Sequence, residues 1–538
     1  MRYPAALLAV LVSGVVLVLA PPASAAALER ASCDTVFDLP GAQCRTLEVP
    51  LDRSGAVPGK VKLFVERDRV RGGDKHATIA VFPGGPGAAT SIYGASFLSD
   101  FGKRRGPHDL LLLDQRGTGR SDYLDCDLAL TPSYYAPPSE DNRLMGKLAE
   151  RCAKQLGARR GFYTTRETVA DLEDVRAALG IDKFILYGVS YGTRDAMAYA
   201  QAHPDHVERI ILDSAVPAAG LDPFGLSTVH ALSRVLAQMC RGGGCDGITA
   251  DPAADLQSLV TRLERGPMRA RDTVTLMGCR VRPAITRSRL YEMLQQVDED
   301  PKLLSQFPVA LAQAAQGKPY QLSVLAAGQS PYLTFCALSR IIKRLIPQPK
   351  SIKQDLDLLQ KSFSGGDQTA RMCEESDLPW PRDTPLPQRQ SIAERAIAGY
   401  GDPVFAPLDR ATVLAGSLVP LCKFWITENK TPPAGPAQLP AVPTLIVSGM
   451  DDLRTPLEDA EALAASSPTA RLLRVPDVGH SVIEDSGCAR RALGHFIRDE
   501  PIADCHLNPR HVPKPARRVP SLQQQLEELL KRLPLPAR

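Results

Sequence analysis

A serine in a glycine-rich turn is the first feature of this sequence that could do chemistry. The motif GVSYG (188–192) follows an apolar run and precedes a helical pattern at 196–202. A GxSxG turn between a strand and a helix exposes the serine hydroxyl above the carboxyl edge of a sheet, and the start of the helix directs backbone donors to the same point. A GxSxG sequence often occurs by chance, so the motif alone predicts little. Its place between a strand and a helix is what predicts Ser190 as a nucleophile.

A serine hydroxyl needs a base, and two later segments present polar side chains directly after apolar runs. One run leads into SGMDDLRTP (448–456) and the next into PDVGH (476–480). When a turn of this kind carries the serine, the acid and then the histidine follow it along the chain. We therefore expect His480 to be the base, because the later histidines have no strand end before them. Asp451 or Asp452 is the expected acid, and periodicity does not choose between them.

Attack on a carbonyl creates an oxyanion, which backbone amides must stabilise. The amide after the nucleophile, that of Tyr191, is the first candidate donor. A second glycine-rich loop, PGGPG (83–87), follows the apolar run 78–82 and favours Gly85 as the second donor. The alternative for this loop is a plain turn, since glycine and proline form turns whatever their function.

The elements that must position these residues alternate between strands and helices. The stretch 168–179 places Val169, Leu172, Val175 and Leu179 on one helical face. Apolar runs bounded by turn residues, with helices between the later ones, predict a mostly parallel sheet covered on both sides. The expected strands are 46–49, 61–65, 78–82, 110–113, 184–187, 207–212, 444–447 and 472–475.

The alternation stops after Asp213 and resumes only near Thr444. The intervening residues are mostly helical in pattern and too many for a structureless loop, so they predict an inserted domain. The expected division is a signal peptide (1–25), a first core part (26–215), a helical cap insertion (216–439), a second core part with the acid and histidine (440–505), and a basic, proline-rich tail with a short amphipathic helix (506–538).

The N-terminus has the form of an export signal. Arg2 precedes an apolar run, and the small residues 23–25 follow it, which predicts cleavage after Ala25 and a secreted or periplasmic protein. A membrane anchor is the alternative, but the run is shorter than a bilayer requires. A lipid anchor at Cys33 is disfavoured by Arg30, which stands where such a signal has an aliphatic residue. We expect no stable membrane insertion once the signal is removed.

Composition excludes some partners and supports export. A net charge of +4 over 538 residues makes no basic face for nucleic acid. Twelve cysteines, all beyond Ala25, favour disulfides in an oxidising compartment. A metal knuckle at Cys240 and Cys245 is the alternative for that pair. The cheapest loops to close predict the pairs Cys33–Cys44, Cys126–Cys152, Cys240–Cys245 and Cys488–Cys505.

Several motifs together resemble one family, the secreted tripeptidyl aminopeptidases and proline iminopeptidases. The resemblance covers about 46–212 and 405–505, whereas the insertion matches loosely. The motifs are PGGPG (83–87), DQRGTGRS (114–121), GVSYG (188–192), GMDDLRTP (449–456) and VGHS (478–481).

The resemblance implies an α/β-hydrolase fold with a large, mainly helical cap and no metal or organic cofactor. It assigns the acid to the aspartate three residues before the Thr-Pro pair, Asp452, and an oxyanion donor to Gly85. It gives Asp114 and Arg116 a scaffolding role. The sequence departs from the pattern at Pro83, where proline iminopeptidases usually carry histidine, and at Ile426, where the secreted relatives favour proline.

The family binds the substrate's amino group through acidic residues of the cap. Glu292, Asp298, Glu374 and Glu375 are candidates here, although acidic residues in helical domains usually face solvent. The expected function is hydrolysis of a peptide bond near a free N-terminus through an acyl-enzyme on Ser190. An esterase or amidase acting on small acyl compounds is the alternative, and a non-catalytic binding protein on the same scaffold is a third hypothesis. The oligomeric state is left open.

Overall fold

The computed structural model describes residues 28–72, 76–124, 126, 141–272, 274–276, 279–281, 284–299, 301–328, 357–426 and 438–507. The expected signal peptide and the expected tail helix lie outside these residues, and both stay predictions.

A single nine-stranded sheet forms the core, in the order β1-β2-β3-β5-β4-β6-β7-β12-β13. The strands from β5 to β13 run parallel, and β1, β2 and β3 extend the sheet antiparallel at one edge. This confirms the mostly parallel sheet expected from the apolar runs. The strands are β1 (Glu29–Arg30), β2 (Gln43–Pro50), β3 (Lys60–Asp68), β4 (Thr78–Phe82), β5 (Leu110–Asp114), β6 (Phe184–Val189), β7 (Val207–Asp213), β12 (Thr444–Gly449) and β13 (Ala470–Val475).

Helices cover both faces of this sheet. Successive residues of a strand point to opposite faces, so Ile185 of β6 lies in one apolar cluster with Leu493 of α18, and Leu186 lies in another with Leu172 of α3. These helices are α1 (Gly94–Phe101), α3 (Thr165–Leu179), α4 (Gly192–Ala202), α16 (Leu457–Ala465), α17 (Val482–Asp485) and α18 (Gly487–Ile497), whereas α2 (Asp141–Leu156) packs against helices of the insertion.

The predicted helix at 168–179 is part of α3, and local signals explain both of its ends. The Thr164 side chain accepts a hydrogen bond from the Glu167 amide and caps the first turn. Gly180 adopts a left-handed conformation with φ 63° and ends the helix.

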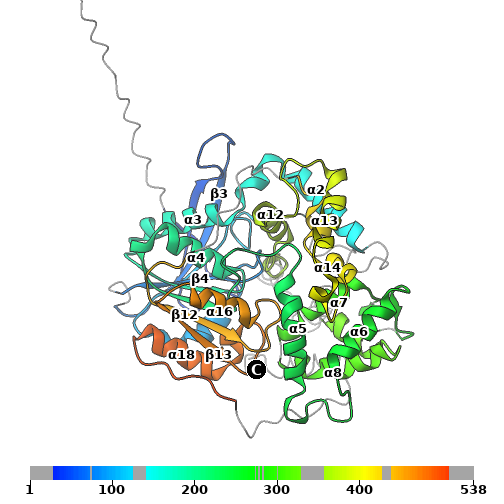
Figure 1. Cartoon of the computed structure of the whole chain (residues 1–538). Coiled ribbons are helices and arrows are strands. Elements are labelled where there is room, and N and C mark those ends of the chain that lie inside the picture. The colour runs from blue at the N-terminus through cyan, green and yellow to red at the C-terminus, as the bar shows by residue number, and fades with distance from the viewer. Residues whose placement is uncertain are drawn as a thin grey trace, which may run out of the picture.

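The chain between β7 and β12 is mainly helical and forms the right-hand part of the molecule in Figure 1, beside the sheet. Its division from the core at residues 216 and 439 stays a prediction. The helices are α5 (Leu226–Met239), α6 (Pro252–Leu263), α7 (Arg287–Leu294), α8 (Pro301–Ala315), α9 (Tyr320–Gly328), α12 (Gly365–Glu375), α13 (Leu386–Ala398), α14 (Arg410–Gly416) and α15 (Val419–Cys422).

Short elements complete the described part of the chain. Two strand pairs lie in the insertion: β8 (Met268–Arg269) with β11 (Ala284–Ile285), and β9 (Val274–Leu276) with β10 (Cys279–Val281). The 3-10 helices are η2 (Gly102–Arg105), η4 (Gly157–Phe162), η5 (Pro204–His206), η6 (Arg241–Gly243), η7 (Val297–Glu299) and η8 (Asp402–Phe405).

Disulfides link neighbouring parts of the chain. All four expected pairs are present, which also rules out a metal knuckle at Cys240 and Cys245, and a fifth bond joins Cys373 to Cys422. None of the helices in the described part of the chain is long and apolar enough to cross a membrane.

Candidate active site

Ser190 stands on a sharp turn between β6 and α4. Its φ is 54°, a left-handed value that a serine adopts only under constraint. The two motif glycines make the turn possible: a Cβ at Gly188 would lie 2.5 Å from the Gly192 carbonyl oxygen, and a Cβ at Gly192 would lie 2.3 Å from the Phe82 carbonyl oxygen. The turn is held by the Ser190 amide, which donates to the Asp213 carbonyl at 2.9 Å.

Asp452 and His480 lie together on the loops that follow β12 and β13. His480 Nδ1 lies 3.0 Å from Asp452 Oδ2. The amides of Arg454 and Thr455 each donate to Asp452 Oδ1 at 2.9 Å, and the Thr455 hydroxyl donates to Oδ2 at 2.7 Å. These donors fix the carboxylate and leave one of its oxygens directed at the imidazole.

The buried pair favours its charged form. Burial opposes the charge on each partner, but the imidazole and the hydrogen bonds from Thr455 lower the pKa of Asp452 below its usual value. Burial likewise acts to lower the pKa of His480, and the neighbouring Asp452 carboxylate outweighs it, so the pKa of His480 is raised. Such a pair can take up a proton at the imidazole while the carboxylate stays ionised.

The structure separates the two adjacent aspartates that the sequence left open. Asp451 makes no hydrogen bond or ion pair with His480 among the described residues, and burial raises its pKa to about 7. The geometry therefore pairs His480 with Asp452, the residue that the resemblance favours.

The other ring nitrogen of His480 is unpaired among the described residues, in a pocket that Ser190 also lines. His480 Nε2 is buried and has no hydrogen-bond partner in the part of the chain that the structure describes. Both residues line one cavity of about 320 Å³, which we call the His480 pocket. Ser190 also lines a second cavity of about 280 Å³ together with Tyr191, which we call the Tyr191 pocket. The serine thus stands between two spaces that a substrate can enter.

The two expected oxyanion donors lie beside the serine. Gly85 lines both pockets, and Tyr191 lines the Tyr191 pocket. Neither of their amides donates a hydrogen bond to another described residue. The loop of Gly85 approaches so closely that a Cβ at Gly84 would lie 3.1 Å from the Ser190 Cβ. Two unpaired amides beside a serine are what an oxyanion site requires.

A residue of the insertion, Asp298 in η7, reaches the same loops. Its carbonyl oxygen accepts from the His480 amide at 3.0 Å, and its Oδ2 accepts from the Leu453 amide at 2.6 Å. A Cβ at Gly479 would lie 2.1 Å from the Asp298 carbonyl oxygen, so this approach requires glycine there. Burial, with the neighbouring Asp452 charge, raises the pKa of Asp298 to about 7. Asp298 is therefore a positioning residue, a role that the sequence did not suggest.

Asp213, at the end of β7, holds the other side of the histidine loop. Its carboxylate oxygens accept from the amides of Val482 and Ile483, each at 2.9 Å. Burial raises its pKa to about 6, against the effect of these two amides. It fixes the first turn of α17 just after His480.

The other acidic candidates of the insertion differ in their surroundings. Glu374 accepts from the Trp425 indole at 2.8 Å. Glu375 accepts from the Tyr191 hydroxyl at 2.7 Å, so it holds the side chain of an expected oxyanion donor. Of the four candidates, only Glu292 lines a pocket shared with Ser190.

The Tyr191 pocket contains a further acid that sequence reasoning missed. Asp459, in the first turn of α16, accepts from the Ser227 hydroxyl at 3.1 Å through Oδ1, whereas its buried Oδ2 has no partner among the described residues. Burial raises the pKa of Asp459 to about 6. A cation in this pocket would stabilise the ionised form.

Asp114 and Arg116 line neither pocket. Asp114 accepts from the Ser91 amide at 2.8 Å and the Arg120 amide at 2.9 Å. Arg116 donates to both oxygens of Asp171, at 2.6 and 2.7 Å. Both brace loops of the core.

Comparisons with known proteins agree with this architecture. The family model described as "alpha/beta hydrolase fold" matches residues 78–237, and the model described as "TAP-like protein" matches residues 407–504. The chain therefore has the α/β-hydrolase fold.

Within that fold, the chain is similar to named peptidases over part of its length. It is 30% identical over 210 residues to the tripeptidyl aminopeptidase of Streptomyces coelicolor, a match that covers 36% of this chain and 39% of that one. It is 33% identical over 152 residues to the proline iminopeptidase of Neisseria gonorrhoeae, covering 28% and 37% of the two chains. The chain thus resembles the family of tripeptidyl aminopeptidases and proline iminopeptidases, and it spans well under half the length of each relative.

A solved structure of proline iminopeptidase from Mycobacterium smegmatis aligns with 84% of this chain and 98% of its own, with a TM-score of 0.36 and 14% identity.

Proposed function

We propose that this protein is a secreted serine peptidase that cleaves peptide bonds near a free N-terminus. The observation that carries the proposal is the arrangement around Ser190: a histidine held by Asp452, with its other nitrogen unpaired in the same pocket, and two unpaired amides opposite. This combination is what acyl transfer by a serine requires.

The reaction proceeds through an acyl-enzyme. Ser190 Oγ attacks the carbonyl carbon while His480 Nε2 takes the hydroxyl proton, and the amides of Gly85 and Tyr191 stabilise the resulting oxyanion. His480 then gives that proton to the leaving amine as the C–N bond breaks. Water, deprotonated by His480, cleaves the ester and restores Ser190. Asp452 stays ionised and orients the imidazole throughout.

The direction of the substrate follows from this proton transfer. The leaving amine must lie near His480 Nε2, and hence in the His480 pocket. The acyl part, which contains the N-terminus, then lies in the Tyr191 pocket. That pocket offers Asp459, whose buried Oδ2 is unpaired, together with Glu292. An ammonium group is the natural partner for these carboxylates.

Export is part of the proposal. Five disulfides among the described residues suit an oxidising compartment. The N-terminal segment of small and apolar residues supplies the expected signal.

Three substrates test the proposal: a peptide with a free N-terminus, the same peptide N-acetylated, and a simple ester. We expect the free peptide to be cleaved with the highest kcat/KM and the acetylated peptide to be nearly inert. Equal cleavage of the acetylated peptide, or turnover of esters alone, would contradict the aminopeptidase assignment and favour the esterase alternative.

A further inference from the structure

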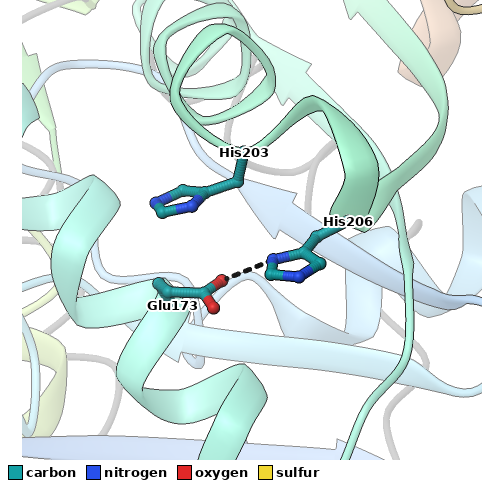
Figure 2. A group of neighbouring side chains, drawn as sticks. All are labelled: Glu173, His203 and His206. Carbon is teal, nitrogen blue, oxygen red and sulfur yellow. Dashed lines mark hydrogen bonds and ion pairs between the residues drawn. The ribbon is translucent and has the colours of Figure 1, made fainter.

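A second group of chemically capable side chains lies at the opposite edge of the sheet from Ser190. It consists of Glu173 in α3, His203 at the C-terminal end of α4, and His206 in η5 just before β7 (Figure 2). Ser190 follows the carboxyl end of β6, whereas His206 precedes the amino end of the parallel strand β7. The proposed reaction uses none of these three residues.

The separations within this group suit a metal ion. The ligand atoms of the three side chains all lie within 4.8 Å of one another. His206 Nδ1 lies 3.2 Å from Glu173 Oε2. A zinc ion bound at its usual distances holds neighbouring ligand atoms of a tetrahedron about 3.3 Å apart. His206 Nδ1 and Glu173 Oε2 therefore already lie about as far apart as two ligand atoms of one zinc ion.

Neighbouring residues fix the ligands in place. Tyr199 donates its hydroxyl to Glu173 Oε2 at 2.8 Å, and its ring lies 5.1 Å from that of His203. Arg176 donates to both oxygens of Glu173, at 2.9 and 2.8 Å. Groups that orient a ligand in this way strengthen metal sites. The positive charge of Arg176 repels a metal cation, so we expect only a moderate affinity for the metal.

The site is also accessible and electrostatically suited to a cation. All three ligands are half-buried, so water can complete the coordination. His203 caps the C-terminus of α4, where the unpaired carbonyls of a helix favour positive charge. Two imidazoles and a carboxylate are a ligand set that zinc accepts, and imidazole also suits copper and nickel.

We propose that Glu173, His203 and His206 bind a divalent transition-metal ion, of the kind represented by zinc, with water in the remaining position. The metal links α3 to the segment that joins α4 to β7, and it stabilises the fold at the edge remote from Ser190. Binding displaces the hydrogen bond between His206 and Glu173, and no covalent chemistry takes place. The sequence alone gave no sign of this site, because Glu173 lies 33 residues from His206.

The test is calorimetric titration of the purified full chain, pre-treated with EDTA, with zinc chloride, together with thermal unfolding. We expect one saturable site and a melting temperature raised by the metal and restored by EDTA. His203→Ala and His206→Ala each weaken binding at least about tenfold and abolish the thermal shift. Tyr199→Phe keeps the ring and removes the hydroxyl, and we expect an intermediate loss.

His495→Ala is the matched control. His495 Nδ1 lies 3.5 Å from Glu500 Oε2, so this is a half-buried histidine beside a carboxylate, but without a second histidine in the group. We expect zinc binding to this variant to equal that of the wild type. Unfolding in EDTA shows whether each variant is folded before metal is added.

The other group with ligand atoms within 4.8 Å, Asp298, Asp452 and His480, provides a second comparison. Zinc binding that survives His203→Ala and His206→Ala but is lost in His480→Ala would overturn the proposal. No saturable binding to the wild type, or loss of binding in His495→Ala, would overturn it as well. None of these outcomes depends on the proposed peptidase activity.

Discussion

The carboxyl edge of the sheet and the inserted helices contribute to the site in different ways. Ser190, Asp452 and His480 each follow the carboxyl end of a parallel strand, so the fold brings them to one edge. Asp298 arrives from a 3-10 helix of the insertion and meets the same loops through tertiary packing. We infer that the sheet edge supplies the chemistry, and that the insertion fixes the geometry and helps to select the substrate.

Substitutions at the carboxyl edge of the sheet should reduce activity the most. His480→Ala removes the base, and we expect kcat to fall by up to about 10⁶-fold, because the histidine and serine act as one unit. Turnover of peptide and ester measures the effect. His495→Ala should match the wild type. A loss in His480→Ala of less than about tenfold would exclude His480 as the base.

Adjacent aspartates give the sharpest pair of variants at this edge. Asp452→Asn leaves the shape but removes the charge that orients the imidazole, and we expect kcat to fall about 10⁴-fold. Asp451→Asn should change kcat little, since Asp451 makes no hydrogen bond or ion pair with His480 among the described residues and its pKa is already raised to about 7. Steady-state kinetics decides between them, and a reversed order of effects would reassign the acid.

A substitution of Asp459, in α16, tests whether the protein selects substrates with a free N-terminus. Asp459→Asn removes the carboxylate proposed to bind the ammonium group, so kcat/KM for free peptides should fall about 10- to 100-fold. Turnover of an ester without an amino group should not change. Glu461→Gln, an exposed residue of the same helix that pairs with Arg474 at 2.7 Å, is the control. Equal losses on both substrates would point to structural damage instead.

The smallest expected effect is that of a substitution in the insertion, at Asp298, on the pH dependence of kcat/KM. The charge of Asp298 contributes to the raised pKa of His480. The reaction needs neutral His480, so kcat/KM rises with pH through a pKa above 6.5. Asp298→Asn should move this acid limb to lower pH by about one unit or less, because Asp298 is itself partly neutral near pH 7.

The pH profile separates positioning from mere stability. An Asp298→Asn protein whose kcat/KM falls equally at every pH, with an unmoved acid limb, would contradict an electrostatic role for Asp298. It would leave only the hydrogen bonds from the Leu453 and His480 amides as the contribution of Asp298.

The difference between the two regions also explains what the sequence could predict. Apolar runs and their order along the chain predicted the parallel sheet and placed Ser190 and His480 at one edge. Asp452 needed the family spacing, because adjacent side chains cannot be told apart by periodicity. Asp459 lies in an ordinary first helical turn, where an acidic residue usually serves the helix itself. The roles of Asp298 and Asp459 depend on contacts between distant segments, which no local pattern records.

Labelling with an active-site fluorophosphonate tests the central claim most directly. The reagent forms a bond to an activated serine, and mass spectrometry of the digested protein locates it. We predict that the wild type is labelled on Ser190 and that Ser190→Ala is not labelled. Labelling that persists in a folded Ser190→Ala protein, or a wild type that never reacts, would contradict the account.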